Sequence, residues 1–163
     1  MRPTRITAAS ALPFIALLLC AAPATGQQSL KGPDVCGWLT PAQLQKVFGR
    51  GFEAPARNDW PPAFAGQTVG TSCTYQGGSS LDVVLIAYVD HSADEAKKTF
   101  EKLAFFFSPN TKVAGIGDEA YIDKQGAIHV LKGKFRYFIR VDASGAQEKT
   151  QVQNLATQVA ARL

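Results

Sequence analysis

The residues best suited to acid–base or metal chemistry are His91 and His129, with the adjacent carboxylates Asp118 and Glu119. No pair of histidines or cysteines has zinc-ligand spacing, and no Gly-x-Ser-x-Gly nucleophile turn is present. Asp118 and Glu119 lead into a predicted strand, where neighbouring side chains point to opposite faces and make a poor acid–base pair. The sequence therefore favours a non-catalytic protein without cofactor or metal. A small periplasmic hydrolase or metal-dependent enzyme using one histidine and one of these carboxylates is the alternative.

A run of basic residues forms the first candidate binding surface. Lys132 and Lys134 flank a predicted hairpin turn, and Arg136 and Arg140 continue along the following strand. Such a face suits an anionic envelope lipid, glycan or protein. An ordinary solvated strand face is the competing interpretation.

Exposed aromatic residues form the second candidate surface. Trp60 and Phe64 lie in a proline-rich stretch, where they would dock a glycan, a peptide or a partner, or cover a sheet edge. A protein inhibitor or assembly accessory that inserts this loop into a partner is a further alternative. One face of a helix cannot bury three consecutive phenylalanines. Phe105 or Phe106 is therefore expected to lie against the long loop over residues 50–70, or against a partner.

The first 26 residues have the order of a secretory signal peptide. Arg2 and Arg5 precede an apolar run over residues 8–20 and small residues up to position 26. The run is shorter than the roughly 20 residues that span a bilayer. We expect cleavage before Gln27, a periplasmic or secreted product, and no transmembrane segment afterwards.

The three cysteines fit an oxidising compartment. Cys20 belongs to the signal, and Leu19 before it departs from the small residue that precedes a lipid-modified cysteine. Cys36 and Cys73 then remain, and two cysteines in an exported domain most simply form a disulfide.

Charge and composition limit the remaining functions. The chain has 17 basic and 13 acidic residues, and loss of Arg2 and Arg5 leaves 15 − 13 = +2. This charge gives no support to nucleic-acid binding. With 46% hydrophobic and 18% charged residues, the chain is neither disordered nor collagen-like.

The elements that must position these residues follow from capping signals and periodicity. Helices are predicted after Thr40, after Ser92 and over residues 146–162, and strands over residues 72–75, 81–89, 120–123, 127–132 and 134–142. Tight turns between strands imply antiparallel pairing. We therefore predict an α+β fold: an antiparallel sheet of about five strands with two to three helices packed on one face. A single monomeric domain is expected over residues 35–163, after a flexible lead-in over residues 27–34.

Several short motifs together resemble a broad group of small exported bacterial envelope proteins, many of them lipoproteins of unknown function. The resemblance implies a compact one-disulfide α+β domain and transfers no functional residue. We therefore expect an exported envelope binding or interaction module with an unknown ligand or protein partner. The motifs are Asp34-x-Cys36-x-x-Leu39-Thr40, Phe48-Gly49, Cys73-x-Tyr75, Val113-x-Gly115-x-Gly117-Asp118-Glu119-Ala120, Lys132-Gly133 and the terminal helix ending at Arg162-Leu163.

Overall fold

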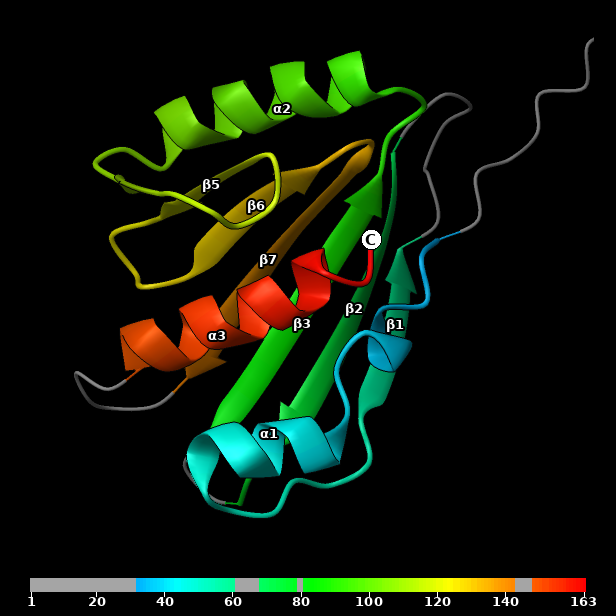
Figure 1. Ribbon diagram of the computed structural model, residues 1–163. Coiled ribbons are helices and arrows are strands. Elements are labelled where there is room, and N and C mark those ends of the chain that lie inside the picture. The colour runs from blue at the N-terminus through cyan, green and yellow to red at the C-terminus, as the bar shows by residue number, and fades with distance from the viewer. Residues whose placement is uncertain (1–31, 61–67, 79–80, 143–147) are drawn as a thin grey trace, which may run out of the picture.

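The computed structural model describes residues 32–60, 68–78, 81–142 and 148–163 (Figure 1). The expected signal peptide, most of the lead-in and Phe64 lie outside these ranges. At the described end of the lead-in, Asp34 accepts a hydrogen bond from Arg57 at 2.9 Å. This contact fixes residue 34 against the sheet.

The fold is α+β, as predicted, but its sheet has seven strands instead of about five. All neighbouring strands pair antiparallel, in the order β1-β2-β3-β7-β6-β5-β4. The strands are β1 (Ala56–Trp60), β2 (Val69–Gln76), β3 (Asp82–Val89), β4 (Thr111–Val113), β5 (Glu119–Ile122), β6 (Ile128–Lys132) and β7 (Phe135–Asp142).

The two strands that the sequence did not reveal are the two edges. β1 is exposed along its whole length, and β4 has only three residues. Neither strand carries the alternation of apolar and polar residues by which a half-buried strand is recognised. Their Arg57, Asp59 and Lys112 side chains are the kind of charged residue that keeps a sheet edge from pairing with other chains.

One face of the sheet carries the main hydrophobic core. α1 (Pro41–Phe48), the short 3-10 turn η1 (Val35–Gly37) and α3 (Glu148–Ala160) cover this face. The hydroxyl of Tyr137 donates a hydrogen bond to the Ala156 carbonyl oxygen at 2.7 Å, which ties β7 to α3. Three apolar side chains of α3 are buried here: Val152, Leu155 and Val159.

The middle helix, α2 (Ala93–Phe106), packs on the opposite face, so two of the three helices share one face of the sheet and the third lies on the other. Its Phe100 packs on Tyr121 and Leu131 in a separate small cluster. Tyr121 and Leu131 alternate along their strands with Ala120 and Val130, which belong to the main core. In Figure 1 the strands β5 to β7 accordingly lie between α2 and α3.

Because α2 covers only the half of the sheet around β5, β6 and β7, the same face of β3 is left more open. Along β3, Val83, Leu85, Ala87 and Val89 are buried in the core, and the intervening residues are only half-buried. This uncovered half of the sheet, next to α2, positions the candidate site.

Candidate ligand-binding cleft

A cleft of about 410 Å³ lies between α2 and the open face of β3, β7 and β6. Leu103 of α2 and Phe107, the residue that follows this helix, form one wall, and Phe138 of β7 contributes to the floor. Apolar and planar side chains therefore dominate the cleft, with a few polar groups placed among them, as in many small-molecule sites. The other lining residues are Tyr88, Thr99, Asp123, Gln125, Ala127, His129, Arg136 and Arg140.

A row of three large side chains extends from the edge of the sheet to the cleft. The Trp60 and Tyr88 rings stack with centroids 6.3 Å apart, and the Arg136 guanidinium lies 5.1 Å from the Tyr88 ring centroid. Gly70 lies between them, opposite Trp60 on one side and Tyr88 on the other. A Cβ at Gly70 would approach Tyr88 to 2.8 Å and Trp60 to 3.1 Å, so a glycine is needed for the two rings to close over it.

Arg136 is held by a buried ion pair. Its Nε and Nη2 donate to the two carboxylate oxygens of Asp90 at 2.6 and 3.1 Å, and the side chains are 7% and 3% exposed. Thr68 donates a third hydrogen bond to Asp90 at 2.7 Å. The charge of Arg136 is therefore neutralised within the protein, and its planar group serves to hold Tyr88 in place.

His129 lies deep in the cleft, inside a stack of aromatic rings. The ring centroids of Tyr121, Phe138 and Phe107 lie 4.6, 5.3 and 5.1 Å from its own. Its Nε2 is 2.9 Å from Asp123 Oδ2. Burial lowers the pKa of His129 more than the hydrogen bond and charge of Asp123 raise it, so the imidazole is neutral near pH 7.

Asp123 is fixed by the turn that it begins. Its Oδ1 accepts hydrogen bonds from the backbone N–H groups of Gln125 and Ala127 at 2.9 and 3.0 Å. Its other oxygen is left for His129. The carboxylate thus shapes the β5–β6 turn and orients the imidazole, a role that satisfies both oxygens without a ligand.

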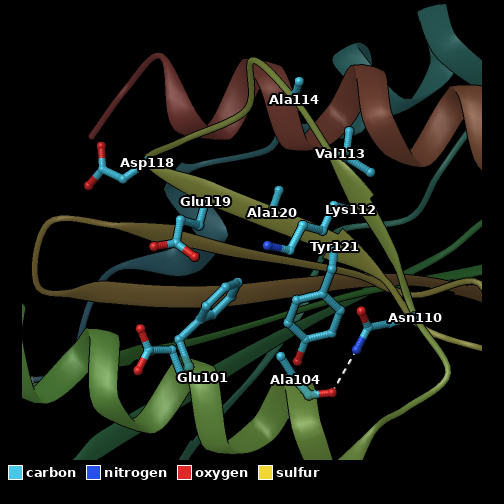
Figure 2. A pocket seen from close by; sticks show the side chains of 11 residues that line it. Glu101, Ala104, Asn110, Lys112, Val113, Ala114, Asp118, Glu119, Ala120 and Tyr121 are labelled. Atoms are coloured by element: carbon cyan, nitrogen blue, oxygen red, sulfur yellow. Dashed lines mark hydrogen bonds between the residues drawn. The ribbon is translucent and has the colours of Figure 1, made fainter.

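A second cavity, of about 660 Å³, lies on the other side of α2 above β4 and β5 (Figure 2). Tyr121 reaches from β5 toward α2 beside Ala104, whose carbonyl oxygen accepts a hydrogen bond from Asn110 at 2.6 Å. The Tyr121 hydroxyl is buried without a hydrogen-bond partner among the described residues. Burial raises the pKa of this phenol to about 12. α2 is therefore flanked by a hollow on each side and anchored between them by a small cluster.

The predicted basic surface is not one face. Lys132 pairs with Phe135 in register and therefore points to the α3 side, where its Nζ lies 3.0 Å from Asp118. Lys134 is exposed and Arg136 is buried. Arg140 reaches the cleft but forms an exposed pair with Asp142 at 2.8 Å. Lys132 lies on β6, before the turn at Gly133, and does not share the face that Arg136 and Arg140 occupy.

Trp60 lies at the end of β1 and is 38% exposed. Phe64, its partner in the predicted aromatic surface, lies outside the described residues. Trp60 stacks on Tyr88 and in this way forms part of the open sheet face. The two surfaces that the sequence suggested separately, around Trp60 and around Arg136, meet at this one tyrosine.

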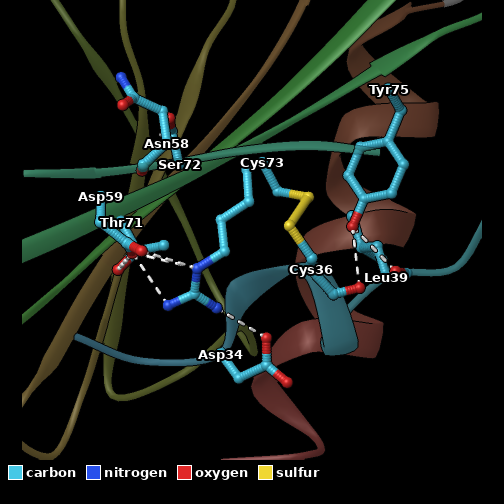
Figure 3. The surroundings of a disulfide bond; sticks show 10 residues. Asp34, Cys36, Leu39, Asn58, Asp59, Thr71, Ser72, Cys73 and Tyr75 are labelled. Atoms are coloured by element: carbon cyan, nitrogen blue, oxygen red, sulfur yellow. Dashed lines mark hydrogen bonds and ion pairs between the residues drawn. A yellow bond between two sulfur atoms is a disulfide. The ribbon is translucent and has the colours of Figure 1, made fainter. Parts of the chain in front are cut away.

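The predicted disulfide is present and joins η1 to β2 (Figure 3). Cys36 and Cys73 have their Cα atoms 5.3 Å apart. Tyr75, two residues beyond Cys73, donates hydrogen bonds to the carbonyl oxygens of Cys36 and Leu39 at 3.3 and 2.8 Å. The bridge and the phenol together fix the segment that leads into α1, far from the cleft and on the core face.

The residues of the enzymatic alternative do not meet. His91 is exposed and precedes α2, and its Nδ1 lies 3.6 Å from the carboxylate of Glu95 in that helix. Asp118 binds Lys132 and the Gly133 N–H, which lower its pKa, and Glu119 pairs with Lys97. The described residues contain no group of three or more His, Cys, Asp or Glu side chains that suits a metal ion.

Sequence reasoning missed Tyr88, Asp90 and Asp123 as parts of the site. Phe138 was the available signal: it is the one apolar residue on the otherwise polar side of β7. In the structure it stacks on His129 beneath α2. An aromatic residue at such a position indicates a second covered face.

The comparisons with known proteins give no family. The chain matches no protein-family model, and no curated protein matches it significantly. Within the described residues, no helix is long and apolar enough to cross a membrane.

Proposed function

We propose that the protein is a non-catalytic binding module of the cell envelope and that its ligand occupies the cleft between α2 and the open sheet face. The observation that carries the proposal is the convergence of Trp60, Tyr88 and Arg136 beside that cleft. These residues come from three different strands, and a glycine at position 70 makes their contact possible. Planar groups held in this way offer stacking area at little cost in conformational entropy.

The charges favour an uncharged ligand with a flat or apolar body and polar substituents. Arg136 is neutralised by Asp90 and Arg140 by Asp142. Asp123 is satisfied by two backbone N–H groups and His129. A sugar ring or another flat ligand would stack on the aromatic floor and accept hydrogen bonds from Arg140 at the rim. The purely anionic ligand suggested by the basic residues of the sequence has weaker support.

An oxidising compartment is part of this proposal. The Cys36–Cys73 bridge supports it, because disulfides persist outside the cytosol. The amino-terminal order of charged, apolar and small residues supports export. We place the protein in the periplasm or secreted fraction, within the group of envelope proteins that its motifs resemble, and expect it to act as a monomer.

The test is a thermal-shift screen of the exported, oxidised protein against neutral oligosaccharides, peptidoglycan fragments, anionic glycans, lipid headgroups and metal ions. A ligand at 100 times its dissociation constant stabilises the fold by about 2.7 kcal/mol. The shift should shrink in Arg140→Ala and in Trp60→Ala. It should persist in Lys132→Ala and Phe105→Ala, which remove a cation and an exposed ring elsewhere.

Two outcomes would count against the proposal. If the thermal shift caused by a ligand is unchanged in both Arg140→Ala and Trp60→Ala, the ligand binds elsewhere. A hit with a metal ion alone, lost in His129→Gln, would instead favour the hydrolase or metal-enzyme alternative.

A further inference from the structure

The carboxyl end of α2 carries the two most exposed large apolar side chains of the described residues. Phe105 is 86% exposed and Phe106 is 79% exposed. The next residue, Phe107, turns inward and lines the cleft. Phe107 thus packs within the fold. Phe105 and Phe106 are exposed to solvent and are not covered by the described residues of the long loop. Adjacent exposed aromatic rings are typical of a docking site.

Lysines surround this pair of rings. Lys102 and Lys98 lie one and two turns before Phe105 on the same side of the helix, and with Glu101 they line a shallow hollow beside it. The described ion pairs of α2 are His91–Glu95 and Lys97–Glu119, so neither Lys98 nor Lys102 has a described carboxylate partner. The solvent side of the helix therefore combines apolar rings with two lysines and the carboxylate of Glu101, which also has no described ion-pair partner, and the local charge is 2 − 1 = +1.

We propose that this end of α2 docks on an anionic lipid bilayer, with Phe105 and Phe106 entering the interfacial region and Lys98 and Lys102 contacting lipid phosphates. Phenylalanine and lysine together are the composition of helices that bind membrane surfaces. The unpaired lysines complement the negative charge of anionic headgroups, which is what favours a lipid surface over a protein partner.

Docking in this way would place the cleft near the membrane. Leu103 and Phe107 line the cleft from the same helical turns that carry Phe105 and Phe106. The helix thus turns one side to the bilayer and the other side to the ligand site. This inference does not depend on which ligand the cleft binds.

The test is co-sedimentation of the exported, oxidised protein with vesicles of phosphatidylcholine, with and without phosphatidylglycerol. The wild-type protein should partition onto the anionic vesicles. Replacing both rings (Phe105→Ser with Phe106→Ser) should reduce the partition coefficient at least about tenfold. Lys98→Gln with Lys102→Gln should reduce it about tenfold on anionic vesicles and leave the neutral vesicles unaffected.

Lys46→Gln is the control, because it removes an exposed cation from α1 on the other face of the sheet and should bind vesicles as the wild type does. Only variants whose melting temperature matches that of the wild type are compared. Equal binding by the double-serine variant overturns the proposal. The proposal is also overturned if the wild-type protein does not bind the anionic vesicles and instead self-associates through these two rings.

Discussion

The buried pair between Arg136 and Asp90 gives the sharpest stability prediction. Arg136→Met removes two hydrogen bonds of 2.6 and 3.1 Å and leaves the Asp90 carboxylate, 3% exposed, with the Thr68 hydroxyl as its remaining side-chain partner. Leaving one charge of a buried pair uncompensated costs about 3–5 kcal/mol. A small domain has about 5–15 kcal/mol in total, so this variant would lose a large part of its free energy of unfolding.

The assay is urea unfolding of the oxidised protein near pH 7. With a slope of about 2 kcal/mol per molar urea, the midpoint should fall by roughly 2 M. The double variant Arg136→Met with Asp90→Asn should lose clearly less than the sum of the two single changes, by about 2 kcal/mol or more. That difference measures the coupling between the two side chains.

The same strand provides a matched control. Arg140 and Asp142 form a pair of the same chemistry at 2.8 Å, but their side chains are 45% and 48% exposed. Arg140→Met should therefore cost less than about 1 kcal/mol. Equal losses in Arg136→Met and Arg140→Met, or additive single changes at the buried pair, would refute the reasoning that burial makes this pair costly to break.

Three further predictions concern the disulfide and the titrating groups. Replacing Cys36 and Cys73 by serine removes a bridge with a sequence separation of 37 and should lower the free energy of unfolding by about 4 kcal/mol in denaturant titrations; a change below about 1 kcal/mol would contradict this. The folded pKa of His129 lies below its unfolded value near 6.5, so its contribution to stability is present above that pH and is lost on acidification by up to about 1.4 kcal/mol per pH unit. His129→Gln should flatten this slope between pH 7 and pH 5 in denaturant titrations, and an unchanged slope would contradict the assignment. Burial raises the pKa of all four tyrosines, to about 12 for Tyr75, so phenolate absorbance should be small at pH 10 and rise together with alkaline unfolding; half-ionisation at pH 10 in the folded protein would exclude these burial assignments.

Much of the fold was predictable because local chemistry specifies it. Thr40 and Gln43 form the expected capping box, and α1 ends at Gly49 in a left-handed conformation. The strongest strand, β3, is bounded almost as its apolar run predicts. Elements with their own caps or periodicity can be read from one sequence.

The arrangement of these elements was less predictable. β6 is buried on both faces, with His129 and Leu131 under α2 and Val130 in the main core. A strand of this kind needs cover on two sides, and only long-range packing decides which helix supplies it.

The candidate site depends on register, which a single sequence does not contain. Trp60, Tyr88 and Arg136 lie on three strands that are far apart in the chain, and they meet only because β1, β2, β3 and β7 pair as observed. The basic residues of β7 were visible, but their partners Asp90 and Asp142 change what they can bind. Charge counted along a strand therefore does not show which cations are free to bind an anion.

The central claim is that the ligand binds between α2 and the open sheet face. The most direct test is an amide chemical-shift map of the oxidised protein with the compound that stabilises it most in the thermal-shift screen. The claim predicts shifts at Tyr88, Leu103 and Phe138, and none at Leu44 and Leu155 on the core face. Shifts confined to the core face, or a screen in which no compound stabilises the protein, would contradict it.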